Sequence, residues 1–207
     1  ARGAHHRRFE TRAPAGRGAG RRGSPDRRAS RELCARARAG RRGAGELGPA
    51  DARWLVASDA GYGFFVSLGE LHSRARAGKA CLRVPAGGSV VVPAPVLGEE
   101  FPGDAWVAAA SNLGRLLMFP AEELPAMARG KGNKVLGIPT AKFKSGEERM
   151  VAMTVLAEQD TLEIVSGGRR MRLKAAEHEK YVGNRGLRGS LLPRGWRKVE
   201  RLGVAVD

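Results

Sequence analysis

Residues 128–139 read Ala-Arg-Gly-Lys-Gly-Asn-Lys-Val-Leu-Gly-Ile-Pro, a basic, glycine-rich turn that runs directly into a short apolar strand. Glycine lets a backbone turn tightly, so the interleaved cations can stay in water while the chain reverses. This stretch predicts a cationic corner at the edge of a β-sheet unit. We call residues 128–134 corner 2, because similar stretches occur on either side of it.

Two weaker copies of the pattern occupy corresponding places in the chain. Corner 1 is Arg-Ala-Gly-Lys-Ala at residues 76–80, which enters the apolar segment 81–85. Corner 3 is Arg-Gly-Leu-Arg-Gly at residues 185–189, which enters the segment 190–193. The repetition predicts three sheet units whose corners together hold a nucleic-acid backbone.

The charge of the chain is consistent with a polyanionic partner. Its 207 residues include 37 Lys and Arg against 21 Asp and Glu, which gives a formal net charge of +16 and a pI of about 11.2. Nucleic acid is the commonest partner of so basic a protein. A solvated basic surface or a basic tail is the alternative interpretation.

Much of that charge lies in residues 1–46, which contain fourteen Arg, no Lys and four acidic residues, for a net +10. The remainder is mostly Ala and Gly, with Phe9 as the single aromatic residue. Such a segment cannot bury enough apolar surface to offset its ordering entropy, so we expect disorder. Two interpretations stay open: a nucleic-acid arm, and out-of-frame translation of a GC-rich gene.

A repeat of 53 residues is visible in the folded part, which we expect to span residues 47–207. Residues 53–57 and 62–66 predict one hairpin, and residues 105–110 and 115–119 predict a second, with Gly61 and Gly114 at the same place in their turns. Short strands repeated at this interval suggest propeller-like blades, near residues 51–98, 104–148 and 149–202. Chance similarity between two hairpins is the alternative.

The third unit is predicted to open with the apolar run 151–156, followed by an alternating strand at 161–165 and another at 170–174. Because strand side chains alternate between faces, Met171 and Leu173 should face inward with Leu162 and Ile164. Three cations then face outward, either to contact DNA or to protect a sheet edge. These are Arg170, Arg172 and Lys174.

Other classes of protein find little support in the sequence. No apolar stretch approaches the roughly 20 residues that a membrane span needs, and no signal peptide is visible. Cys34 and Cys81 are expected to be two free thiols of an intracellular protein. We expect no catalytic residue and no metal site, because the histidines lack ligand spacing, residues 183–190 lack a phosphate-loop lysine, and Tyr62 and Tyr181 have no positioned base nearby.

Four segments resemble the C-terminal region of the A subunit of bacterial DNA topoisomerase IV, within the gyrase A C-terminal family. They are Val-Ala-Ser-Asp-Ala-Gly-Tyr-Gly-Phe at 56–64, Leu-Leu-Met-Phe-Pro at 116–120, Lys-Gly-Asn-Lys-Val-Leu-Gly-Ile-Pro at 131–139 and Val-Gly-Asn-Arg-Gly-Leu-Arg-Gly at 182–189. The resemblance covers about residues 51–202. Residues 1–46 depart from it, which leaves the number of blades open.

The resemblance implies an all-β fold, the β-pinwheel, which is a propeller-like ring of four-stranded blades that exchange strands. It implies a domain that binds and bends DNA on a basic rim and selects which duplex is passed. Strand cleavage would belong to a tyrosine of a preceding domain, and the ATP and Mg of the full enzyme would bind on other domains, so no cofactor is expected here. The implied partners are duplex DNA, the rest of the A subunit and the B subunit of topoisomerase IV, in the bacterial cytoplasm at the nucleoid.

Three functions are compatible with these features of the sequence. The first is a non-catalytic DNA-binding domain of a type II topoisomerase, whose corner cations would contact phosphates without reading sequence. The second is a propeller-type protein-interaction module with incidental charge, and the third is an RNA-binding protein that uses its Arg-rich arm. The corner contacts of the first are Arg76, Lys79, Arg129, Lys131, Lys134, Arg185 and Arg188.

Overall fold

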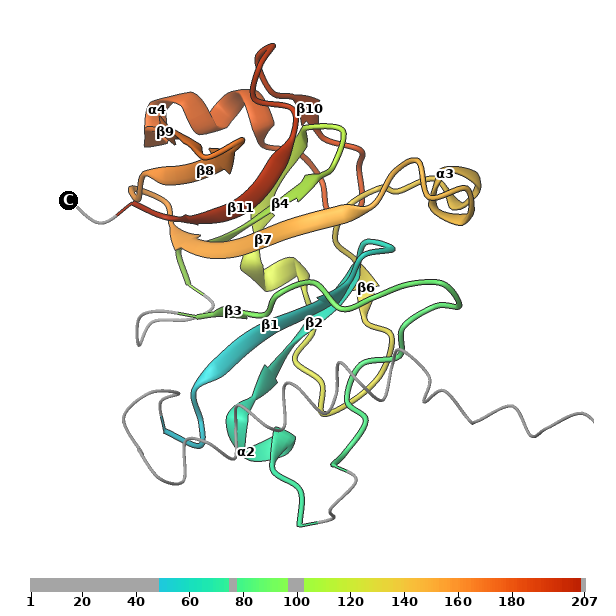
Figure 1. Cartoon of the computed structure of the whole chain (residues 1–207). Coiled ribbons are helices and arrows are strands. Elements are labelled where there is room, and N and C mark those ends of the chain that lie inside the picture. Colours follow the sequence, from blue (N-terminus) through green and yellow to red (C-terminus); the bar gives the residue numbers. More distant parts are fainter. Residues whose placement is uncertain (1–48, 75–77, 97–102, 206–207) are drawn as a thin grey trace, which may run out of the picture.

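Three antiparallel sheets make up the part of the chain that the computed structural model describes, residues 49–74, 78–96 and 103–205 (Figure 1). The predicted all-β fold of sheet units is therefore confirmed for these residues. The disorder expected for residues 1–46 concerns a segment outside the described residues. No helix in the described ranges is long and apolar enough to cross a membrane.

The first sheet is built on the first predicted hairpin. Its strand order is β3-β1-β2-β6, and β1 pairs with β2 from Arg53 opposite Ser67 to Ser58 opposite Tyr62. A short helix, α2, leaves the end of β2. The bounds of these elements are β1 Arg53–Ser58, β2 Tyr62–Ser67, α2 Leu68–Leu71, β3 Ala94–Pro95 and β6 Asn133–Lys134.

The second sheet is built on the second predicted hairpin and has the order β10-β5-β4-β7. The run expected to open the third unit is β7, and it pairs with β4 along most of its length. The hairpin of the third unit is therefore β8–β9. The bounds are β4 Ala105–Ser111, β5 Arg115–Pro120, η1 Ala121–Glu123, α3 Thr140–Lys144, β7 Met150–Ala157 and β10 Ser190–Leu191.

The third sheet has three strands among the described residues, in the order β11-β8-β9. Its register places Leu173 opposite Leu162 and Met171 opposite Ile164, which confirms the predicted inward face. The helices α4 and η2 follow β9. The bounds are β8 Leu162–Ser166, β9 Arg169–Leu173, α4 Ala175–His178, η2 Glu179–Tyr181 and β11 Val199–Val204.

Neighbouring units exchange strands. The strand β6 comes after the second hairpin in the sequence but pairs with β2 of the first sheet, with Lys134 opposite Tyr62. The strand β10 comes after the third hairpin and pairs with β5 of the second sheet, with Ser190 opposite Leu116. The strand β6 forms the end of corner 2, and β10 directly follows corner 3, so each exchange fixes its corner on the edge of the preceding unit.

Two of the three core clusters lie between the sheets. Side chains on successive strand positions point to opposite faces, and Leu117 and Phe119 of β5 join the cluster shared with the first sheet, whereas Leu116 and Met118 join the cluster shared with the third. Both faces of the second sheet are thus covered. This explains why β4 and β5 read as nearly continuous apolar runs.

Candidate nucleic-acid interface

Each corner contains a glycine with a positive φ angle. Gly78, Gly132 and Gly189 have φ angles of 75°, 75° and 70°, a region that non-glycine residues rarely adopt. At corners 2 and 3, the neighbouring backbone also leaves no room for a side chain at this glycine. A Cβ on Gly132 would lie 2.2 Å from the carbonyl oxygen of Gly63, and one on Gly189 would lie 2.4 Å from that of Leu116.

Backbone hydrogen bonds link corner 2, and likewise corner 3, to the segment that follows the preceding corner. The N–H of Gly130 in corner 2 donates to the carbonyl of Cys81 at 2.8 Å, and Arg83 N–H donates back to Gly130 at 2.7 Å. Beyond corner 2, Gly137 N–H donates to the carbonyl of Leu187 in corner 3 at 2.7 Å. The three corners therefore form one continuous border that crosses the first and second sheets.

Corner 2 brings its lysines together over one aromatic ring. The Lys131 ammonium lies 3.7 Å from the centroid of the Tyr62 ring, and the Lys134 ammonium lies 5.8 Å from it. Arg185 of corner 3 donates from its guanidinium to the Lys134 carbonyl at 2.8 Å. Lys131 is exposed and the other two cations are half-buried. Three of the predicted contacts thus come together at the meeting point of two corners.

The other described cations of corners 1 and 2 are on the surface. Arg129 and Lys79 are both exposed, and the Lys79 ammonium donates to the carbonyl of Glu70 at 3.1 Å. Arg76 lies outside the described residues. Lys79 and Arg129 therefore occupy the same border as Lys131, whereas the placement of Arg76 stays a prediction.

Corner 3 differs because its second arginine is bound to an acid. The guanidinium of Arg188 contacts the carboxylate of Glu148, whose side chain is 1% exposed. Arg115 approaches the same carboxylate, with its Nε 3.9 Å from Oε1, and donates to the carbonyl of Gly189 at 3.0 Å. The pairing with Glu148 offsets part of the charge that Arg188 would offer to a phosphate.

A profile of the DNA gyrase C-terminal domain, beta-propeller family matches residues 53–96 and 105–157. The A subunit of DNA topoisomerase 4 from Pseudomonas aeruginosa is 44% identical over 156 residues, which is 75% of this chain. The chain belongs to the DNA gyrase A C-terminal family. It spans 20% of the length of that relative.

Solved structures agree with this membership of the gyrase A C-terminal family. The C-terminal domain of ParC from E. coli has a TM-score of 0.67 and 36% identity, with 77% of this chain and 63% of that chain covered. A DNA gyrase A C-terminal domain shares the fold at 18% identity, with a TM-score of 0.58 and coverage of 78% and 51%. The β-pinwheel expected from the resemblance is confirmed.

The cations of the third sheet form a separate group in this family member. In Figure 1, β9 and α4 lie at the upper left, whereas β6 lies on the right. Arg170 and Arg201 both approach the carboxylate of Glu163, at 3.4 and 3.8 Å, and both stay about two-thirds exposed. Arg172 and Lys174 are also exposed. The structure does not bring these residues next to the corners, although all lie on the surface as predicted.

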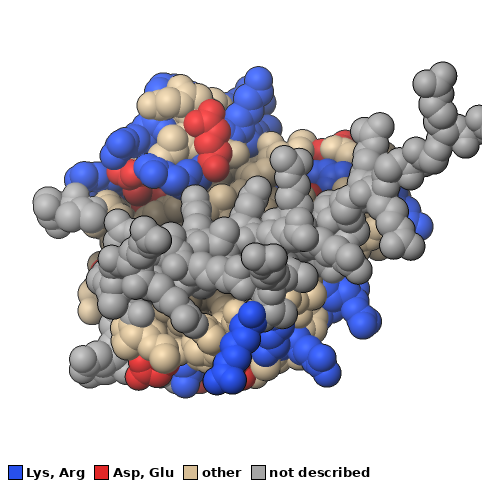
Figure 2. Space-filling model, turned by 60° about the horizontal axis from the view of Figure 1, so that its bottom comes forward, with Lys and Arg blue, Asp and Glu red and all other residues tan. Residues whose placement is uncertain are grey.

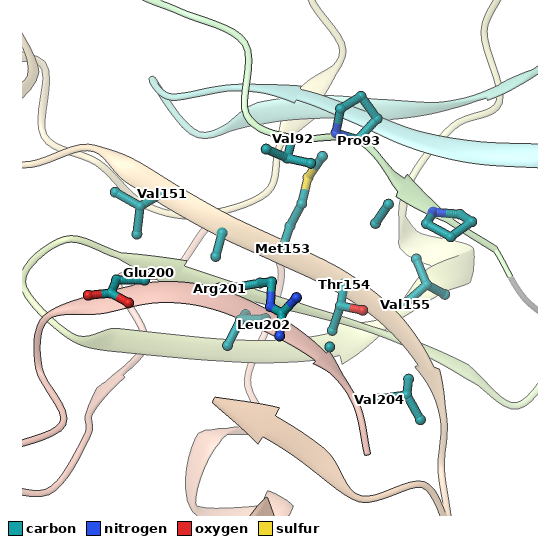
Figure 3. A pocket seen from close by; sticks show the side chains of 14 residues that line it. Val92, Pro93, Val151, Met153, Thr154, Val155, Glu200, Arg201, Leu202 and Val204 are labelled. Atoms are coloured by element: carbon teal, nitrogen blue, oxygen red, sulfur yellow. The ribbon is translucent and has the colours of Figure 1, made fainter. Parts of the chain in front are cut away.

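The space-filling view shows how the charges are distributed on one face. In Figure 2, Lys and Arg side chains gather along the lower and right borders and again at the upper side, and some acidic side chains lie beside them in each place. An apolar hollow of about 440 Å³ lies between β3, β7 and β11 (Figure 3). Its lining contains one acidic and one basic residue, Glu200 and Arg201, and is otherwise uncharged, so it offers no basic surface.

Two residues of the interface were not expected from the sequence. The sequence places Tyr62 in an apolar strand with no positioned base nearby, and Glu148 lies in the charged stretch Gly-Glu-Glu-Arg at 146–149, which is typical of a solvated loop. The position of Tyr62 directly after the turn glycine, shared with Arg115 after Gly114, is the pattern that could have indicated a contact with the corners. Nothing in the sequence distinguishes Glu148 from Glu147. Among the described residues, no group of three His, Cys, Asp or Glu side chains is placed to hold a metal ion.

Proposed function

We propose that this chain binds duplex DNA through the border formed by its three corners. Lys79, Arg129, Lys131 and Lys134 provide exposed or half-exposed charges along it. Such contacts neutralise phosphates and release counterions, and they position DNA without reading its sequence. The observation that carries the proposal is the continuity of the border, because Gly130 of corner 2 bonds to the segment after corner 1, and Gly137 after corner 2 bonds to Leu187 of corner 3.

Bending of the DNA follows from the same arrangement. The corners belong to stacked sheets that follow one another around the molecule, so a straight duplex cannot reach all of them. Smooth bending of a short site costs on the order of 1–6 kcal/mol, which additional phosphate contacts can offset. A domain of this kind would favour one duplex over another by shape rather than by base sequence.

The relatives suggest the larger setting. They are named as the A subunit of DNA topoisomerase 4, so we propose that the chain is the DNA-binding C-terminal part of such a subunit. In that setting, strand cleavage and ATP hydrolysis, with their Mg, belong to other domains. The rest of the A subunit and the B subunit are the protein partners, and the bacterial nucleoid is the place of action.

A salt titration tests the proposal. Fluorescence anisotropy of labelled duplex DNA is measured with the full chain at several salt concentrations. If about 6–10 phosphates are contacted, affinity should fall about 10³–10⁵-fold between 50 and 200 mM salt. Lys131→Glu should weaken binding more than Lys144→Glu, which makes the same charge change on α3, outside the corners. Equal losses would mean that net charge rather than the border decides.

The Arg-rich arm provides the competing explanation. An RNA-binding protein that works through residues 1–46 would lose binding when that segment is deleted. The corner proposal expects most duplex binding to survive the deletion and to remain sensitive to Lys131→Glu. A protein-interaction module with incidental charge would show neither the steep salt dependence nor the effect of Lys131→Glu.

A further inference from the structure

One position recurs in all three units, namely the first residue of the returning strand. Tyr62, Arg115 and Arg169 begin β2, β5 and β9, and each directly follows a glycine with positive φ. In the first two units, the side chain at this position contacts the corner that belongs to the next unit. Tyr62 contacts the lysines of corner 2, and Arg115 donates to Gly189 of corner 3. In these two units, the first residue of the returning strand therefore contacts the corner of the following unit.

Tyr62 is well suited to this task because its own backbone is fixed. It pairs with Ser58 of β1 on one side and with Lys134 of β6 on the other, and its side chain is half-buried against the main core cluster. Corner 2 carries glycines on both sides of Lys131, with φ angles of 151° at Gly130 and 75° at Gly132. A rigid ring therefore lies beneath a lysine whose backbone is intrinsically permissive.

The contact distances support an attractive role for the ring. An ammonium within about 6 Å of an aromatic centroid is attracted by the negative face of the ring, and Lys131 and Lys134 both meet this criterion. The ring therefore also reduces the cost of placing two like charges side by side. The ammonium of an exposed lysine has three N–H donors, so contact with the ring leaves others for a phosphate oxygen.

We propose that Tyr62 is a positioning residue for DNA binding, whose ring holds the Lys131 ammonium on the border. The inference rests on the proposed function, since it assigns a DNA contact to Lys131. The aromatic face carries the effect, so the phenol hydroxyl is dispensable. Phenylalanine can replace Tyr62, whereas leucine, which has bulk but no π-system, cannot.

The test is a double-mutant cycle on the full chain with a duplex DNA probe at low salt. Tyr62→Leu lowers affinity about two- to fivefold, the factor that corresponds to a cation–π contact at an exposed site. Tyr62→Phe leaves affinity within experimental error of the parent chain. In the Lys131→Gln background, the further loss caused by Tyr62→Leu is clearly smaller, because the nearer ammonium is gone and only that of Lys134, at 5.8 Å, remains in reach of the ring.

A measurement without DNA separates the inference from the function on which it rests. Ring currents shift protons above an aromatic face upfield, so the Lys131 ε-CH₂ protons are shifted upfield in the parent chain and in Tyr62→Phe. They return to ordinary values in Tyr62→Leu. Thermal unfolding of each variant verifies that the sheet is intact.

Three results would overturn the assignment: ordinary Lys131 ε-CH₂ shifts in the parent chain, equal losses in Tyr62→Phe and Tyr62→Leu, or an undiminished Tyr62→Leu loss beside Lys131→Gln. If Tyr62→Leu does not fold, the shifts of the parent chain and the affinity of Tyr62→Phe still decide. A failure of the DNA-binding proposal gives a different result. In that case Lys131→Gln alone leaves the affinity for DNA unchanged, while the Lys131 ε-CH₂ protons of the parent chain are still shifted upfield.

Discussion

The guanidinium of Arg149 contacts the carboxylate of Asp59 at 2.5 Å, and this ion pair joins the second sheet to the first. Asp59 lies in the turn between β1 and β2 and is buried, with 4% of its surface exposed. The same carboxylate accepts hydrogen bonds from the N–H and the hydroxyl of Ser89, both at 2.9 Å. The Asp59 side chain therefore links its own turn to two segments that are far away in the sequence, one at Ser89 and one at Arg149.

Asp59→Ala should lower the free energy of unfolding by about 2–3 kcal/mol, because it removes the acceptor of several hydrogen bonds and leaves Arg149 without its carboxylate partner, although the Gly87 carbonyl still accepts from it. Arg149 is about one-third exposed, so water compensates part of the loss. Urea unfolding followed by tryptophan fluorescence measures the change. The control is Asp104→Ala at an exposed turn position, where we expect a change within about 0.5 kcal/mol. Equal effects would refute the role of the ion pair.

The corner glycines permit a matched comparison. Gly132 and Gly146 have nearly equal φ angles, 75° and 77°, but a Cβ would collide with the Gly63 carbonyl at the first and meet nothing within 4 Å at the second. Gly146→Ala should cost about 1–2 kcal/mol from backbone conformation alone. Gly132→Ala should cost about 1–3 kcal/mol more, because the clash has to be relieved. Thermal unfolding of the two variants would show no difference if corner 2 did not pack against β2.

Arg188 should matter more for stability than for DNA. Its guanidinium contacts the buried Glu148, whose Oε1 has no hydrogen-bond partner among the described residues. Arg188→Gln should destabilise the fold by about 2–3 kcal/mol, since it leaves a buried carboxylate poorly compensated. Its effect on duplex affinity should be smaller than that of Lys131→Gln.

The same prediction has an internal control. Glu148→Gln removes the buried charge, so adding it to Arg188→Gln should restore part of the lost stability. Chemical unfolding of the two single variants and the double variant gives the coupling energy directly. Additive losses would show that the two side chains do not act as a pair.

Stability at high pH should depend on Tyr181. Burial, and secondarily the nearby Glu177 carboxylate, raises the pKa of Tyr181 above the ordinary value of 10.0. The folded state therefore keeps the phenol proton at pH values where the unfolded state loses it, so this contribution is complete below about pH 10 and declines as the pH rises toward the raised pKa. Thermal unfolding of the parent chain and Tyr181→Phe between pH 8 and 11 measures the difference. A constant difference across this range would contradict the shift.

The hairpins could be predicted because their evidence is local. Apolar runs on both sides of Gly61 and Gly114 specify two strands and a turn without reference to the rest of the chain. The alternation in β9 likewise assigned Met171 and Leu173 to the inner face. The pairing partner of a strand, in contrast, could not be predicted from the local sequence. The exchanged strands β6 and β10 have two residues each, too few for any pattern, and β7 is apolar enough to join either neighbouring sheet.

For the charged residues, too, the local sequence does not predict the tertiary contacts. A cation on a glycine-rich corner is expected to be exposed, and Lys131 is exposed. Arg188 sits in a similar local sequence, yet it reaches Glu148, a residue 40 positions away that the fold alone buries. Charge patterning along the chain predicts where cations are, and tertiary contacts decide which of them are paired.

Strand exchange has a consequence for how such a protein can be divided. Because β6 completes the first sheet although it lies beyond the whole second hairpin, no cut between adjacent repeats yields two intact pieces. A truncation after Leu124 would deprive the first sheet of its fourth strand. A fragment that starts after Leu124 would contain β6 but would lack β2, the strand with which β6 pairs. Recombination between relatives should therefore preserve runs of consecutive repeats, and a lone repeat transplanted into another protein should fail to fold.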